Sequence, residues 1–325
     1  MPRAARLDMP GLLQHVIMRG IERRDIFRDD EDRKMFLGRF SELLQETGTD
    51  CLGWALLSNH AHLLLRPRGK KLSLLMRRLL TGYAINFNLR YHRNGHLFQN
   101  RYKSIVCEEE PYLLELIRYI HLNPLRAGLV KDVDELDRFK WSGHAVILGG
   151  RELAGQNVGE VLQYFGKRKA VAKREYKRFI RDGVSRGRRD ELVGGGLRRS
   201  LKLEGPGGVE SFDERVLGTG EFVDRLRQEK SLADRMPARM SINGVIERIG
   251  KVFGIEAGEL RRRDRSQRFS DARAVISYFA VREMGQNGAE VARKLNISRS
   301  GVSAAADRGK DLVKKNQHYR DLVDK

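Results

Sequence analysis

The sequence predicts an α+β protein whose first half forms an antiparallel sheet with helices packed on it, followed by an all-α domain. Apolar runs of strand length and segments with helical periodicity follow one another in the order β-α-β-β-α-β-α within the first 149 residues. Composition changes after Gly149-Gly150, and residues 236–320 contain only helical patterns. The chain has 325 residues, which is enough for two domains that each bury a core.

The elements of the first half are predicted from periodicity and from the residues that end each segment. Residues 11–19 and 51–66 are apolar runs, and Ser58-Asn59 divides the second run into two strands or one bent strand. Residues 95–106 are predicted to be extended. The predicted helices cover Asp29–Glu46, Leu72–Tyr91 and Glu110–Ala127, with acidic residues at the start of the first and glycines after the first and the last.

The predicted domain boundaries follow these changes of pattern. Residues 1–149 form the α+β domain, and residues 236–320 form the helical domain. Residues 150–235 are expected to be a basic helical connector followed by a linker rich in glycine and arginine.

The chain is strongly basic, which indicates a polyanionic partner. Lys and Arg number 63 against 43 Asp and Glu, and the formal net charge is +20. Nucleic acid is the simplest such partner, and an anionic membrane surface is the alternative. No apolar run reaches the roughly 18 residues of a membrane-spanning helix, and the first residues lack the apolar core of a signal peptide. The only cysteines, Cys51 and Cys107, suit a reducing cytoplasm, where we expect the protein to reside.

A histidine pair and a tyrosine are the candidate reactive groups. His60 and His62 flank Ala61, so both fall on one face if the segment is a strand, and together they suit one metal ion. Tyr119 and Asn123 are four residues apart and share a helix face. If that face meets the strand, the amide oxygen of Asn123 becomes a third ligand and Tyr119 lies beside the ion. The alternative is two satisfied histidines at a strand end and a half-buried core tyrosine.

Other tyrosines of the same domain compete with Tyr119 for the role of nucleophile. None of them has a polar side chain four residues later, as Tyr119 has. These alternatives are Tyr83, Tyr91, Tyr102 and Tyr112.

Basic and aromatic residues near these groups suggest a track for DNA. Arg101 and Lys103 alternate with Phe98 and Tyr102, and stacking combined with charge binds single strands. Arg126 lies one turn beyond Asn123. Further candidates are Arg77, Arg78, Arg90 and Arg93. For each of them a solvated helix face is the alternative.

Four stretches in the first half together resemble the HUH-type single-tyrosine transposases, particularly the REP-associated tyrosine transposases. They are His15-Val-Ile-Met-Arg-Gly20, Leu57-Ser-Asn-His60-Ala-His62, Gly95-His-Leu-Phe-Gln-Asn-Arg101-Tyr-Lys-Ser104 and Arg118-Tyr119-Ile-His-Leu-Asn123-Pro-Leu-Arg-Ala-Gly128. The resemblance covers residues 11–149. It implies a ferredoxin-like or RRM-like sheet, metal ligation by His60, His62 and Asn123, and Tyr119 as the nucleophile.

The resemblance also implies a reaction. A divalent cation, Mg²⁺ or Mn²⁺, polarises a phosphodiester that Tyr119 attacks. The product is a 5′-phosphotyrosine and a free 3′-OH, and the reverse step joins a different 3′-OH without ATP. The implied substrate is single-stranded or hairpin DNA. Dimers occur in the wider family, whereas REP-associated members can act as monomers with Tyr119 serving its own subunit, so both states stay open.

The C-terminal half is predicted to hold a helix-turn-helix that binds duplex DNA. Residues 288–308 read as two helices around the turn Asn296-Ile297-Ser298, with Ser298 capping the second helix and Arg299 and Ser300 facing the major groove. The alternative is a small helical bundle with an ordinary charged surface.

Residues 236–320 resemble the C-terminal DNA-binding domain of the replication initiator DnaA. By this resemblance Arg263 and Arg265 match a basic loop that reaches the minor groove. The initiator's Asp-His-Thr-Thr motif is replaced here by Ser298-Arg299-Ser300-Gly301, so fold and duplex binding carry over better than sequence preference.

The leading hypothesis is therefore a metal-dependent DNA transposase with an added duplex-binding domain. A second hypothesis is a non-catalytic DNA-binding regulator derived from such an enzyme. A third is an endonuclease that acts on RNA or on replication origins. A covalent adduct on tyrosine separates the first from hydrolytic nucleases.

Overall fold

The computed structural model describes residues 6–187, 189, 192, 213, 215–232, 242–262, 264, 266–283, 288–316 and 319. Their contacts divide them into two units. The first unit holds the described residues up to 192 together with residues 213–232, and the second holds those from 242 onward.

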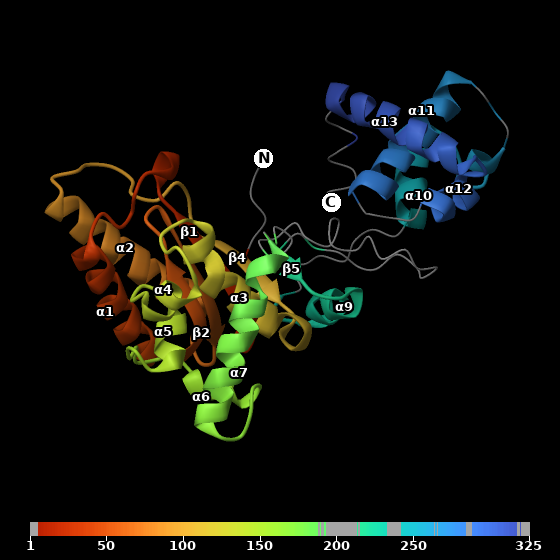
Figure 1. The fold of residues 1–325 in the computed structure, drawn as a ribbon. Helices are drawn as coiled ribbons and strands as arrows, with labels where there is room; N and C mark the ends of the chain where they lie inside the picture. Colours follow the sequence, from red (N-terminus) through yellow and green to blue (C-terminus); the bar gives the residue numbers. More distant parts are fainter. Residues whose placement is uncertain are drawn as a thin grey trace. The chain divides into compact units, whose positions relative to one another are not determined.

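A five-stranded sheet is the centre of the first unit (Figure 1). Its strands are β1 (Leu13–Arg19), β2 (Thr49–Leu56), β3 (His60–Pro67), β4 (Lys103–Cys107) and β5 (Val216–Leu217), in the order β2-β3-β1-β4-β5. The first four strands pair antiparallel, which confirms the α+β prediction. The short β5 pairs parallel with β4, so the complete sheet is mixed.

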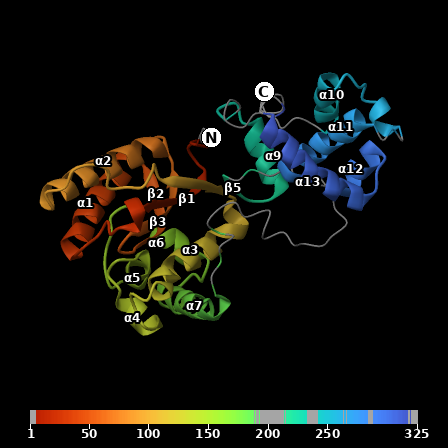
Figure 2. The same cartoon turned by 90° about the horizontal axis from the view of Figure 1, so that it is seen from above.

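Two long helices cover one face of the sheet (Figure 2). They are α1 (Asp30–Thr47) and α2 (Leu72–Arg90). The Asp29 side chain caps α1 by accepting a hydrogen bond from the Asp32 N–H, and Gly48 ends it in the left-handed region at φ 59°. The buried residues of α1 and α2 pack with Trp54 of β2 in a core that includes Phe36 and Tyr83.

The helix α3 (Glu109–Arg126) covers the opposite face (Figure 2). Short helices α4 (Val133–Arg138) and α5 (Gly143–Leu148) follow it. Helices α6 (Val158–Gln163) and α7 (Lys169–Asp182) pack in the same core as α3, and Tyr176 and Ile180 of α7 are fully buried. The described part of residues 150–235 thus contributes core side chains, β5 and α9 (Gly220–Gln228) to the first unit.

The alternation of side chains along β3 decides which residues face α3. Ala61, Leu63 and Leu65 belong to the core beneath α1 and α2, whereas Leu64 belongs to the core beneath α3. His60 and His62 share the face of Leu64, because side chains two residues apart point the same way. The histidine pair therefore points toward the helix that carries Tyr119.

The second unit is a small helical bundle. It contains α10 (Ile242–Val252), α11 (Gln267–Ser277), which continues as one π-helical turn over Tyr278–Glu283, α12 (Gly288–Leu295) and α13 (Arg299–Lys315). Helices α11 and α13 approach so closely that a Cβ atom on Gly309 would lie 2.0 Å from the Ala274 carbonyl oxygen. Across the described ranges, no helix of the protein is both long enough and apolar enough to cross a membrane.

Candidate functional site

The sheet face beneath α3 brings three histidines together. His60 and His62 come from β3, and their ring centres are 5.2 Å apart. His15 comes from the neighbouring strand β1, and its ring stacks on His62 with centres 5.1 Å apart. His15 is fully buried and His62 is 3% exposed. The predicted pair is thus extended by a third ring from another strand.

Each histidine of the predicted pair is held at its Nδ1 atom. The Nδ1 of His62 lies 2.9 Å from the Nε2 of His15, and the Nδ1 of His15 lies 3.1 Å from the Leu192 carbonyl oxygen. The Nδ1 of His60 lies 2.6 Å from the Oδ1 of Asn59. The Asn59 Nδ2 in turn donates to the Arg23 carbonyl oxygen at 3.0 Å.

Burial keeps the two innermost rings neutral. It lowers the pKa of His15 to about 4, with the nearby Lys103 adding to the effect. Burial also lowers the pKa of His62 well below its ordinary value, and His15, His60 and Arg19 lower it further. Neutral imidazole is the form that binds metal ions.

Tyr119 of α3 packs edge-on against this cluster. Its ring centre is 5.8 Å from that of His62 and 6.0 Å from that of His15, with interplanar angles of 81° and 74°. The side chain is 7% exposed. The predicted nucleophile and the predicted ligand His62 are therefore neighbours in one chain.

Asn123 lies one helical turn after Tyr119 and is 9% exposed. Within the part of the chain that the structure describes, its Nδ2 is buried and has no hydrogen-bond partner. A buried amide normally has its polar atoms satisfied, so this nitrogen is unusual among the buried polar groups of the site.

Basic side chains lie near Tyr119 and the histidines. The guanidinium carbon of Arg126 lies 5.6 Å from the centre of the Tyr119 ring. Lys103 pairs with Ile17 in the register of β1 and β4, so it lies on the face of His15 and is exposed. Arg19 pairs with His60 and is also exposed. These cations suit the phosphate groups of a nucleic acid.

The residues fit a divalent cation. Two imidazoles that share one ion at about 2.1 Å have ring centres roughly 5 Å apart, as His60 and His62 do. Asn123, one helical turn after Tyr119, carries the amide oxygen that the sequence predicts as the third ligand. No group of three or more His, Cys, Asp and Glu side chains is placed to hold a metal within the described ranges. The predicted set differs from such a group because its third member, Asn123, is an amide.

The competing tyrosines have structural roles. Tyr83 is fully buried and donates to the Ile26 carbonyl oxygen, and burial raises its pKa. Tyr91 donates to Asp32 at 2.9 Å, and burial together with that carboxylate raises its pKa to about 12. The pKa of Tyr102 is raised to about 12 by burial, and the guanidinium of Arg6 lies over its ring. Tyr112 lies in the first turn of α3, two turns before Tyr119.

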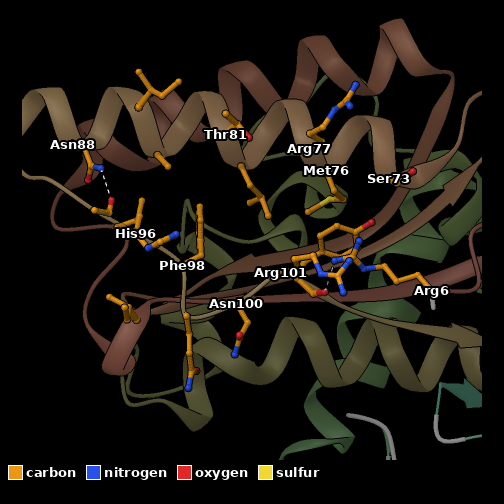
Figure 3. A pocket seen from close by; sticks show the side chains of 18 residues that line it. Arg6, Ser73, Met76, Arg77, Thr81, Asn88, His96, Phe98, Asn100 and Arg101 are labelled. Carbon is orange, nitrogen blue, oxygen red and sulfur yellow. Dashed lines mark hydrogen bonds between the residues drawn. The ribbon is translucent and has the colours of Figure 1, made fainter. Parts of the chain in front are cut away.

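Arg101 lines a groove between α2 and residues 95–102 (Figure 3). The groove has a volume of about 880 Å³ and is mostly apolar. Met76 and Thr81 of α2 face Phe98 across it, and Arg77 lies on the α2 side of the groove. An apolar cleft with a basic rim suits an unpaired nucleobase and its phosphate.

Two other arginines of the predicted track take part in ion pairs. Arg78 pairs with Glu46, and Arg90 forms salt bridges with Asp29 at 2.7 Å and Asp32 at 2.5 Å. Since Asp29 and Asp32 start α1, Arg90 ties the end of α2 to the start of α1. Arg93 lies near the Phe87 ring, 5.6 Å from its centre.

In the second unit, α12 and α13 are joined by a short turn where the sequence predicts a helix-turn-helix. Asn296 is in the left-handed region at φ 52°, and Ser298 caps α13 by accepting a hydrogen bond from the Gly301 N–H at 3.0 Å. Arg299 and Ser300 follow as exposed residues of the first turn. Arg263 and Arg265 lie outside the described residues.

The sheet presents a histidine pair to a tyrosine-bearing helix, and part of the chain matches a known family. Residues 9–123 match the family described as IS200-like transposases. The predicted resemblance to the single-tyrosine transposases is therefore confirmed for this part of the chain. The resemblance of residues 236–320 to the DnaA domain stays a prediction.

The chain is also similar to a solved structure of a REP-associated tyrosine transposase bound to a REP hairpin. The sequence identity is 16%, the TM-score is 0.39, and the similarity covers 47% of this chain and 90% of that chain. No curated protein sequence matches the chain.

Sequence reasoning did not assign roles to His15, Asn59 or Arg19. A signal was present for His15, because it falls on an alternate position of a predicted strand, as the histidine pair does. Asn59 precedes His60 directly. What the sequence could not supply was the pairing of β1 with β3, which places Arg19 opposite His60.

Proposed function

We propose that this protein is a metal-dependent DNA transposase that cleaves and rejoins single-stranded or hairpin DNA through a 5′-phosphotyrosine on Tyr119. The observation that carries the proposal is the edge-on packing of the Tyr119 ring against His62 in the same chain. The match of residues 9–123 to IS200-like transposases supports the reaction class.

His60, His62 and Asn123 would hold Mg²⁺ or Mn²⁺. The bound cation supplies Lewis-acid polarisation of the scissile phosphate. The chain's own residues do the remaining work. Arg126 and Lys103 bind and orient the phosphate, and packing of the Tyr119 ring against His62 and near Arg126 holds the nucleophile in place.

The proposed reaction exchanges one phosphoester bond for another. The Tyr119 oxygen forms a bond to phosphorus, the bond between phosphorus and the 3′ oxygen breaks, and the phenol proton leaves for solvent while the 3′ oxygen takes one up. Attack by another 3′-OH reverses these changes and releases Tyr119. Because His62 and Tyr119 meet within one chain, the arrangement supports action as a monomer.

The second unit is proposed to bind duplex DNA through the first turn of α13. Exposed Arg299 and Ser300 follow the cap at Ser298, where a recognition helix contacts base edges. Arg101 is proposed to contact single-stranded DNA along the groove beside α2.

The test is a gel assay for a covalent adduct. The purified protein would be mixed with labelled hairpin and single-stranded oligonucleotides from DNA flanking its gene, with Mn²⁺ or with EDTA. We expect an SDS-resistant shift that needs Mn²⁺, is absent in Tyr119→Phe and persists in Tyr112→Phe on the same helix. DNA retention that survives Tyr119→Phe, without any adduct, would replace this proposal with a non-catalytic DNA-binding regulator.

A further inference from the structure

Two chains of hydrogen bonds end on the histidine pair, and each begins at a backbone carbonyl. One runs from the Leu192 carbonyl through His15 to His62. The other runs from the Arg23 carbonyl through Asn59 to His60. A carbonyl oxygen only accepts hydrogen bonds, so each chain has a fixed direction.

The direction of the first chain decides the tautomer of His62. The His15 Nδ1 must carry the proton, because it faces the Leu192 carbonyl oxygen at 3.1 Å. In a neutral ring the Nε2 of His15 is then an acceptor, so the Nδ1 of His62 donates to it across 2.9 Å. The lone pair of His62 is left on Nε2.

The second chain leads to the same tautomer on His60. The Asn59 Nδ2 donates to the Arg23 carbonyl at 3.0 Å, which turns the Asn59 Oδ1 toward His60. That oxygen accepts from the Nδ1 of His60 at 2.6 Å. The lone pair of His60 is therefore also on Nε2.

The segment that supplies the Arg23 carbonyl is fixed to the Ser58-Asn59 loop by backbone contacts. The Ser58 carbonyl accepts from Ile26 and Phe27 at 2.8 and 2.9 Å, and the Asn59 carbonyl accepts from Gly20 at 2.9 Å. Glu22 and Arg23 have left-handed backbones at φ 52° and 60°, a conformation uncommon for side chains of this size. Such strain persists where surrounding contacts enforce it.

We propose that His15 and Asn59 are positioning residues that lock His62 and His60 in the Nδ1–H tautomer, so that both rings present Nε2 to one cation. This inference rests on the proposed metal site. Partners behind metal-binding histidines commonly fix the tautomer and the ring orientation in this way. Here the two partners differ in kind, one a buried histidine and the other a partly exposed amide.

The tautomers can be read without metal or DNA. Long-range ¹H–¹⁵N NMR of the full-length protein, labelled at histidine, distinguishes protonated from unprotonated ring nitrogens. His60→Gln and His62→Gln would assign the two rings. We expect both rings to carry the proton on Nδ1. A proton on Nε2 of either ring in the wild-type protein would overturn the proposal.

The second measurement is the affinity for Mn²⁺ alone, by calorimetry or electron paramagnetic resonance. We expect Asn59→Ala and His15→Phe to weaken it roughly 10- to 100-fold. Asn59→Asp and His15→Gln keep an acceptor and should restore most of it, while exposed His96→Gln should leave it unchanged.

The two measurements separate the inference from the proposed function. Folded Asn59→Ala with wild-type Mn²⁺ affinity and wild-type tautomers would overturn the positioning role, and Asn59 tolerates substitution because it is only partly buried. Wild-type protein with the expected tautomers but no Mn²⁺ binding would instead contradict the proposed metal site.

Discussion

Arg126 lies seven residues after Tyr119 on α3, and its guanidinium carbon is 5.6 Å from the centre of the Tyr119 ring. Seven residues are two helical turns, so both side chains are on the face that meets the sheet. A cation at this position attracts the phosphate that the proposed reaction brings beside Tyr119.

We therefore expect Arg126→Ala to slow formation of the covalent DNA adduct by roughly 100-fold. Single-turnover adduct formation at saturating DNA would measure the change. Arg78→Ala removes the same charge from a salt bridge on α2 and should leave the rate near that of the wild type. Equal rates for Arg126→Ala and wild type would exclude a role for Arg126 in the chemical step.

The unsatisfied amide of Asn123 leads to a stability prediction. Because its Nδ2 is buried without a partner within the described part of the chain, an apolar side chain of similar size should cost little. We expect Asn123→Leu to change the free energy of unfolding by less than about 1 kcal/mol, in urea unfolding followed by circular dichroism.

The same substitution should weaken Mn²⁺ binding at least about tenfold. Asn123→Asp keeps an oxygen ligand and should retain binding. If Asn123→Leu unfolds the protein while leaving Mn²⁺ affinity intact in the folded fraction, Asn123 is a structural residue and not a ligand.

Duplex binding by the second unit is tested at Arg299. We expect Arg299→Ala to reduce duplex affinity and to lower the slope of log K against log salt by about 0.9 if its contact is to a phosphate. Lys310→Ala removes the same charge from an exposed position further along α13 and serves as the control. Fluorescence anisotropy across a salt series measures both, and an unchanged affinity in Arg299→Ala would place the interface elsewhere.

The two cysteines should be unreactive in the folded protein. Burial raises the pKa of the Cys107 thiol to about 12 and also raises that of Cys51. Burial therefore favours the protonated form of both thiols, and the thiolate is the reactive form. We expect labelling by a maleimide at pH 8 only after denaturation. Fast labelling of native protein would show that the sheet opens locally.

The sequence was sufficient to predict the sheet, its two long covering helices and the helix bearing Tyr119, because periodicity and end residues mark each one. It also identified His60, His62 and Tyr119, which the structure brings together. These residues are recognisable because their spacing matches strand and helix periods.

What the sequence could not show depends on contacts between distant segments. The strand β5 has only two residues, too few for any pattern. Residues 150–235 were expected to connect two domains, yet α7 buries Tyr176 in the first core, where its hydroxyl contacts His121 and His144. The sequence places Arg101 close to Lys103 and predicts one DNA track for both. In the structure Lys103 begins β4, whereas Arg101 lines the groove beside α2.

The contact between His15 and Leu192 spans 177 positions of the chain. During synthesis, His15 therefore leaves the ribosome long before the carbonyl that orients it has been made. A nascent chain that already contains His60, His62 and Tyr119 still lacks the Leu192 carbonyl that orients His15. The support of the proposed cation site would then be completed only late in translation.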